Sequence, residues 1–123
     1  MRYYIIAGEA SGDMHAANLM GEIQNLDEKW DFRYWGGDRM QEKGGELVKH
    51  YKYHSFMGFA EVVMHLPAIL KNLKRCKQDI LEYNPDVLIL VDYPGFNLRI
   101  AEFAHKQGIK VAYYISPQIW AWK

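Results

Sequence analysis

Five apolar residues in succession, at 87–91 (VLILV), lie between Asp86 and Asp92. A short apolar run bounded by polar residues is typical of a strand that is buried on both of its faces. Such a strand lies in the interior of a sheet, where other elements cover it above and below. Asp92 is therefore expected at the end of the strand, where the chain leaves the core.

The rest of the chain alternates between strand-like and helix-like segments. Further strands are expected at 3–7, 32–37 and 110–116, and helices at 12–26, 38–45, 58–85 and 97–108. Residues 46–56 are ambiguous, with a short strand around 51–56 as one interpretation. Pro67 either kinks the long helix or opens a second helix in its first turn. This order predicts one α/β domain with a mainly parallel sheet and helices on both faces.

Composition limits the class of protein. The 15 basic and 15 acidic residues give a formal net charge of zero, whereas nucleic-acid binders are strongly basic. The single cysteine, Cys76, excludes an intrachain disulfide and fits a reducing compartment, and we expect it to be an inert, partly buried thiol. No run approaches the roughly 18 apolar residues of a membrane span, so any membrane association is expected to be peripheral.

Three polar clusters follow three of the expected strands. They occupy residues 8–13, 92–97 and 116–118. Because ligands of open parallel sheets bind beyond the carboxyl ends of the strands, we expect these clusters to converge on one rim. The first cluster lacks both G-x-G-x-x-G and G-x-x-x-x-G-K-[ST], so a dinucleotide or triphosphate site is not expected there. A purely structural role, with Ser11 as the helix N-cap and Asp13 in the first turn, is equally open.

Asp92 is the candidate for acid–base chemistry. A carboxylate at the dry mouth of a site can take a proton from a sugar hydroxyl if its pKa is raised. A structural Asp that caps the following turn or helix fits the same spacing, and Asn97 is likewise either an N-cap or a ligand contact. The five histidines, His50 and His54 included, show no convincing metal-ligand spacing, so neither a metal nor another cofactor is expected.

An apolar stripe runs along the long helical region and is followed by a basic segment. The stripe contains Phe59, Val62, Val63, Leu66, Ile69, Leu70 and Leu73, and the cations are Lys71, Lys74, Arg75 and Lys77. Core packing against the sheet is the usual meaning of such a stripe. The alternative is an interfacial helix whose apolar face meets acyl chains and whose cations meet anionic lipid.

Four segments together resemble the lipid-A-disaccharide synthase family. They are AGEASGDMHAA at 7–17, FMGFAEVV at 56–63, PDVLILVDYPGFNLRIA at 85–101 and YYISPQIWAW at 113–122. The segments occur in the family's order and cover essentially the whole chain. The resemblance implies an inverting glycosyltransferase of the GT-B arrangement, which has two Rossmann-like domains. Residues 1–123 would be a truncated N-terminal, acceptor-side domain without the C-terminal nucleotide-binding domain.

The resemblance also implies a reaction and its partners. Members join UDP-2,3-diacylglucosamine to 2,3-diacylglucosamine 1-phosphate, forming the lipid A disaccharide and UDP. The implied partners are these acylated glucosamine lipids, the UDP-sugar donor and the cytoplasmic face of the inner membrane of a Gram-negative bacterium, where the enzyme is peripheral. No nucleic acid and no cofactor are implied, and a homodimer of the full-length enzyme is compatible with the resemblance. The truncated piece is expected to be inactive alone.

Residue roles carried over from the resemblance concern the rim and the stripe. Asp92 would be the general base that takes the proton from the acceptor's 6-hydroxyl. The cleft would be lined by Glu9, Ser11, Asp13, Asn97 and Ser116. Membrane contact would fall to Phe59, Val62, Val63, Leu66, Ile69 and Leu70. Many members read D-x-P-D-F-N where this chain has Gly95, so a role shared by two carboxylates would fall on Asp92 alone.

The sequence alone leaves two other classes of function open. A non-catalytic flavodoxin-like module would bind a small ligand without any affinity for acylated sugars. A membrane-surface adaptor would use only the amphipathic helix, and its binding to lipid would not depend on Asp92.

Overall fold

The computed structural model describes residues 1–53 and 63–115. The strands are β1 (Arg2–Ala7), β2 (Asp31–Gly36), β3 (Glu46–His50), β4 (Val87–Val91) and β5 (Val111–Tyr114). The helices are α1 (Ala10–Leu26), α2 (Asp38–Glu42), α4 (Leu66–Tyr83) and α5 (Pro94–Lys106), and a 3-10 turn spans Tyr51–Tyr53. Of the helices in this part of the chain, none combines the length and apolar character needed to cross a membrane.

The five strands form one sheet in the order β3-β2-β1-β4-β5, and every neighbouring pair is parallel. The chain runs outward from β1 through β2 to β3 and then crosses to β4 on the other side of β1. The order of the strands therefore reverses between β1 and β4. In open α/β sheets, the carboxyl side of this switch point is where ligands bind.

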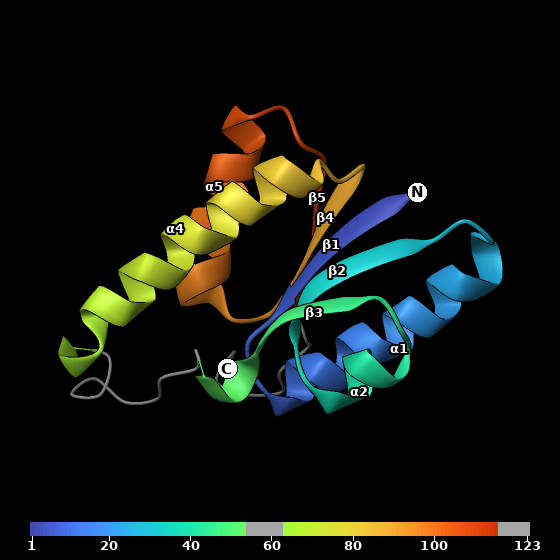
Figure 1. Ribbon diagram of the computed structural model, residues 1–123, viewed down its shortest axis with the longest axis horizontal. Coiled ribbons are helices and arrows are strands. Elements are labelled where there is room, and N and C mark those ends of the chain that lie inside the picture. Colours follow the sequence, from blue (N-terminus) through green and yellow to red (C-terminus); the bar gives the residue numbers. More distant parts are fainter. Residues whose placement is uncertain (54–62, 116–123) are drawn as a thin grey trace, which may run out of the picture.

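Helices cover the sheet from both sides, as predicted: α1 and α2 lie on one face and α4 and α5 on the other (Figure 1). Alternate residues of β1 contribute to two hydrophobic cores, one on each face of the sheet. Ile5 packs toward α1, and Ile6 packs toward α4 and α5. The first core contains Ala16, Met20, Phe32, Met40 and Val91. The second contains Trp35, Cys76, Ile80, Leu90, Phe96 and Ile100.

A partly buried polar network ties α4 to the sheet. Arg33 on β2 donates to the Asp79 carboxylate, with 2.7 Å between Nε and Oδ2. The Tyr4 hydroxyl donates to the same oxygen at 2.7 Å and accepts from the Trp35 indole N–H at 2.7 Å. Each member therefore has a partner, which offsets the cost of removing these groups from water.

The structure corrects two details of the expected elements and decides between the two alternatives for Pro67. The third strand is Glu46–His50 rather than a segment around 51–56, because Leu47 and Val48 alternate between the two cores whereas residues 51–53 form a 3-10 turn. Residues 54–56 lie outside the described residues. Pro67 lies in the first turn of α4, so it opens a helix there instead of kinking one.

The second correction concerns α5, which begins at Pro94 and not near Asn97. Proline suits the first helical turn because its fixed φ is helical and its missing N–H is not needed there. The expected end of this helix at Gly108 is confirmed by a φ of 74° at that glycine. An ion pair also lies on the surface of this helix, with 3.2 Å between Lys106 Nζ and Glu102 Oε1.

Candidate functional site at the β1–β4 switch point

The carboxyl ends of β1 and β4 lie side by side, because Ala7 pairs with Val91 in the parallel register. The next residues along the two strands are Gly8 and Asp92. Two of the three polar clusters expected on one rim are thus adjacent in space. They meet at the point where the strand order reverses, which is the expected location of a ligand site in this type of sheet.

The Asp92 main chain is fixed in an unusual conformation. Asp92 and Tyr93 both have left-handed backbones, with φ of 48° and 52°. The Asp92 N–H donates to the Tyr114 carbonyl at 2.9 Å, and the Asp92 carbonyl accepts from the Tyr113 hydroxyl at 2.8 Å. A third bond, at 2.9 Å, comes to the same carbonyl from the Asn97 side-chain amide. Non-glycine residues held in this way cluster at functional sites.

Tyr93 closes the space between the two loops. A Cβ atom on Gly8 would lie 2.3 Å from the Tyr93 ring, so only glycine fits at position 8. The Tyr93 ring also stacks on Phe96, with 5.4 Å between centroids. Burial and, to a smaller extent, the negative charge of Glu9 raise the pKa of Tyr93 to about 12, so the phenol is neutral at pH 7.

Asp13 lies in the first turn of α1, as expected, but its carboxylate is directed to α2. It is 3% exposed and accepts from the backbone N–H groups of Gly37 at 2.8 Å, Arg39 at 3.0 Å and Met40 at 3.1 Å. These are donors of the first turn of α2 and of its N-cap, which carries no side-chain cap of its own. The contacts favour a structural role for Asp13, whereas its contact with a substrate stays a prediction.

Ser11 and Glu9 differ from Asp13 in that both are exposed at the rim. Helix α1 begins at Ala10 with Glu9 as its N-cap residue, so the expectation that Ser11 is the N-cap is wrong. Glu9 does not cap the helix through its side chain, since it makes no capping hydrogen bond. Both positions stay candidates for contact with a ligand.

Asn97 is inside α5, so its interpretation as an N-cap is wrong. Its side chain is completely buried, and its amide N–H₂ donates to the carbonyls of Asp92 at 2.9 Å and of Ile6 at 3.3 Å. These bonds link the ends of β1 and β4 directly. The structure therefore gives Asn97 a positioning role beneath Asp92, and contact with a ligand stays a prediction. Ser116, Phe59 and Val62 lie outside the described residues.

The apolar stripe divides into a buried and an exposed part. Leu73 is in the core and Ile69 is half-buried against it, in agreement with the core interpretation. Val63, Leu66 and Leu70 are 55%, 48% and 53% exposed. The outward residues are thus open to a partner, and their contact with a membrane stays a prediction.

Several residues of the site carry no recognisable sequence signal. Tyr93 precedes a proline, which favours an extended backbone and not the left-handed one observed. Tyr113 reads as an ordinary strand residue, although its hydroxyl bonds the Asp92 carbonyl. Pairing in the folded sheet alone brings Tyr113 to Asp92.

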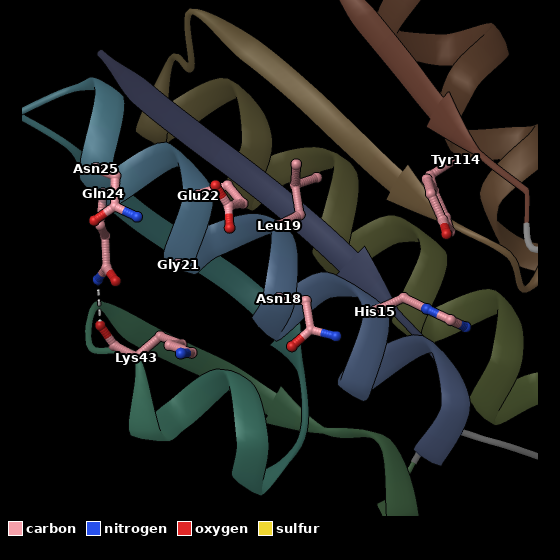
Figure 2. Close-up of a pocket in the computed structure, with 9 residues that line it drawn as sticks. All are labelled: His15, Asn18, Leu19, Gly21, Glu22, Gln24, Asn25, Lys43 and Tyr114. Carbon is pink, nitrogen blue, oxygen red and sulfur yellow. Dashed lines mark hydrogen bonds between the residues drawn. The ribbon is translucent and has the colours of Figure 1, made fainter.

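A hollow of about 650 Å³ with a mainly polar lining lies along α1 (Figure 2). His15 and Tyr114 border one end, with 5.6 Å between their rings, and Lys43 borders the other. Neither Glu9 nor Asp92 lines this hollow, so it is separate from the switch-point site. Among residues 1–53 and 63–115, no three His, Cys, Asp or Glu side chains gather in a group that could hold a metal ion.

The chain matches a known protein family over almost its whole length. A family model described as lipid-A-disaccharide synthetase matches residues 3–123. The chain belongs to this family. A lipid-A-disaccharide synthase of Trichlorobacter lovleyi is 47% identical over 122 residues, 99% of this chain and 32% of that relative.

Other relatives agree with this assignment. A lipid-A-disaccharide synthase of Geobacter sulfurreducens is 44% identical over 99% of this chain, and lipid-A-disaccharide synthase 1 of Legionella pneumophila strain Philadelphia 1 is 42% identical over 99%. The chain spans about a third of the length of these relatives, 32% in each case. Membership of the lipid-A-disaccharide synthetase family is thus established for a region that contains the switch-point site.

Proposed function

We propose that the chain is the N-terminal, acceptor-side part of an inverting glycosyltransferase that makes the lipid A disaccharide. The full reaction joins UDP-2,3-diacylglucosamine to 2,3-diacylglucosamine 1-phosphate and releases UDP. The observation that carries this proposal is the family match over residues 3–123, in which Asp92 lies at the switch point of the sheet. A non-catalytic flavodoxin-like module is not favoured, because the relatives compared here are named as synthases.

In this proposal Asp92 is the general base. Its carboxylate takes the proton of the acceptor's 6-hydroxyl while that oxygen bonds to the anomeric carbon of the donor. The bond from the anomeric carbon to the UDP oxygen breaks on the opposite face, and UDP leaves with the electron pair. Positioned bases typically accelerate such steps by about 10²–10⁴-fold. The rigid main chain at Asp92, held by Tyr113 and Asn97, supports this role because a base must be fixed in place.

The rim and the outer face of α4 provide the substrate contacts in this proposal. Glu9 and Ser11 meet hydroxyl groups of the acceptor sugar, together with Ser116, while Asp13 and Asn97 hold the loops in position. The exposed residues Val63, Leu66 and Leu70 contact the cytoplasmic face of the inner membrane, where the lipid substrates reside. A second, nucleotide-binding domain and a homodimer belong to the full-length enzyme in this proposal.

An assay of product formation tests the function. The 123-residue chain and the longer protein that carries it are each incubated with both acylated glucosamine substrates, and disaccharide and UDP are measured by mass spectrometry. We expect equimolar disaccharide and UDP from the longer protein and none from the 123-residue chain. Absence of disaccharide from the longer protein would contradict the proposal, and product from the chain alone would contradict the need for a second domain.

A further inference from the structure

The Tyr93 ring contacts the loop that follows β1 as well as the first turn of α5. A Cβ atom built on Gly8, the first residue after β1, would lie 2.3, 2.4 and 2.7 Å from three atoms of this ring. The same ring stacks on Phe96, with 5.4 Å between the centroids and 18° between the planes. Tyr93 therefore fills the space that separates the two loops of the switch-point site.

Phe96 gives the Tyr93 ring a rigid support. It is 4% exposed, and its centroid lies 5.8 Å from the ring of Trp35. Trp35 is completely buried, and its indole N–H donates to the Tyr4 hydroxyl at 2.7 Å. Close-packed interiors transmit a displacement because they have little room to absorb it. A shift of the loop at Gly8 should thus move the Tyr93 ring and the backbone that carries it.

The Tyr93 backbone has a conformation that its sequence does not favour. Its φ is 52°, in the left-handed region, whereas a residue before proline prefers an extended backbone. The Tyr93 carbonyl accepts from the Asn97 N–H at 2.9 Å, in the first turn of α5. Asp92 directly precedes Tyr93 and has a φ of 48°. The direction in which the Asp92 carboxylate leaves the strand therefore depends on two successive left-handed residues.

We propose that Tyr93 is a positioning residue for Asp92, and that its ring fixes the separation between the loop after β1 and the loop after β4. This inference rests on the proposed function, because that function makes Asp92 the base. Catalytic groups must be held within about 0.5 Å of their productive geometry, and a misplacement of about 1 Å can cost about 10²-fold in rate. The ring supplies this positioning, so the phenol hydroxyl is not needed for it.

Turnover of variants of the longer protein tests the positioning role. Tyr93→Ala should lower kcat by about ten-fold or more and leave KM within about two-fold, because the base is misplaced while the substrate contacts remain. Tyr93→Phe keeps the ring and should retain near-normal kcat. In the Asp92→Asn background, Tyr93→Ala should change kcat by less than about two-fold, because no base is left to position. Equal kcat in Tyr93→Ala and Tyr93→Phe would overturn the proposal.

A double variant tests the contact between the two loops. Gly8→Ala places a Cβ atom against the Tyr93 ring, so it should lower the Tm of the longer protein and lower kcat by about 10²-fold. Tyr93→Ala removes the ring, so Gly8→Ala with Tyr93→Ala should recover most of the lost Tm and the kcat of Tyr93→Ala alone. A double variant with no higher kcat than Gly8→Ala would overturn the proposal.

Gly95→Ala is the matched control for the glycine substitution. A Cβ atom built on Gly95 has no neighbour within 4 Å, so it does not meet the Tyr93 ring. The effects of Gly95→Ala and Tyr93→Ala on kcat should therefore combine as a simple product. If Gly8→Ala and Tyr93→Ala also combine as a simple product, the two loops are not coupled through the ring and the proposal is wrong.

The outcomes separate the positioning role from the proposed function. If Asp92→Asn abolishes turnover while Tyr93→Ala leaves kcat unchanged, the positioning role alone is refuted. If Asp92→Asn keeps near-normal turnover, the assignment of the base is refuted, and the positioning role falls with it. Recovery of Tm without recovery of kcat in the double variant would leave Tyr93 a packing role only and would also overturn the proposal.

Discussion

The Asp92 main chain is held by groups from two different elements. Its left-handed backbone and that of Tyr93 cost about 1–3 kcal/mol per residue. The Tyr113 hydroxyl and the Asn97 amide offset part of this cost by donating to the Asp92 carbonyl at 2.8 and 2.9 Å. The position of the carboxylate therefore depends on residues that never need to touch the substrate.

Removal of one of these donors should be measurable. Tyr113→Phe leaves the ring in place and deletes the hydroxyl, and we expect it to lower the free energy of unfolding by about 1 kcal/mol. The kcat of the longer protein should fall as well, because the base is less firmly placed. Tyr114→Phe is the control, because Tyr114 contacts Asp92 only by accepting its N–H at the backbone carbonyl, which the substitution keeps. We expect Tyr114→Phe to change the free energy of unfolding in urea by no more than about 0.5 kcal/mol. Equal losses for both variants would contradict this account of Asp92.

Asp13 and Ser11 provide a second contrast at the residue scale. Asp13→Ala leaves the backbone N–H groups of Gly37, Arg39 and Met40 without their acceptor, and we expect a loss of about 2–3 kcal/mol in urea unfolding. Ser11→Ala changes an exposed side chain and should cost no more than about 0.5 kcal/mol. If Asp13→Ala unfolds as the unaltered chain does but the longer protein loses activity, Asp13 contacts the substrate and does not cap α2.

At the scale of elements, α4 is attached to the sheet through Asp79. Burial alone would raise the pKa of this carboxyl, but the hydrogen bonds from Arg33 and Tyr4 and the charge of Arg33 together lower it below the usual 3.8. The folded pKa is thus depressed relative to the unfolded chain. Its contribution to stability is fully present above the unfolded pKa and is lost as the pH falls through the folded pKa.

Asp79→Asn should remove this pH dependence. At pH 7 we expect the substitution to cost about 2 kcal/mol, because Arg33 loses a charged partner. Below about pH 4 the difference from the unaltered chain should begin to shrink, because the unfolded chain binds a proton at Asp79 at a higher pH than the folded chain does. Glu102→Gln breaks an ion pair whose two side chains are 70% exposed and should change stability by less than about 0.5 kcal/mol. A difference between Asp79→Asn and the unaltered chain that is the same at pH 7 and pH 3 would contradict this assignment.

The elements also show which features the sequence pattern could reveal. The run at 87–91 identified β4 correctly because five apolar residues in succession have few alternatives. The beginning of α5 was missed by three residues, since Tyr93 adopts a left-handed backbone that the pre-proline rule does not favour. The cap that Asp13 gives to α2 was also missed, because it joins residues 24 to 27 positions apart. Contacts of this kind arise only after the helices pack on the sheet.

At the scale of the whole molecule, the two faces of the sheet have different roles. The α1 side builds the rim loop with Glu9 and Ser11, whereas the hollows on the α4 side are lined by apolar and basic groups, among them Leu70, Leu73 and Arg99. The proposed function uses this division, with the acceptor sugar at the rim and the exposed leucines of α4 at the membrane. The polar clusters at the ends of the expected strands anticipated the rim, but the hollow between α4 and α5 depends on the packing of these two helices and was not visible in the sequence.

Exposed leucines of α4 should determine binding to lipid surfaces. Leu66→Ser with Leu70→Ser is expected to reduce co-sedimentation with anionic vesicles several-fold, because about half of each side chain is exposed on that face. Leu26→Ser is the control, since Leu26 is 88% exposed at the end of α1 on the other face. Vesicle binding that is equal in the double variant and in Leu26→Ser would contradict the membrane contact.

The most direct test of the central claim is the turnover of the longer protein with Asp92→Asn. Asparagine keeps the size of the side chain and removes its basicity, so we expect kcat to fall by about 10²–10⁴-fold with unchanged thermal unfolding. Asp86→Asn is the matched control at the amino end of the same strand, where the side chain accepts from the Arg2 N–H, and it should retain near-normal turnover. Near-normal turnover of Asp92→Asn would contradict the assignment of Asp92 as the base.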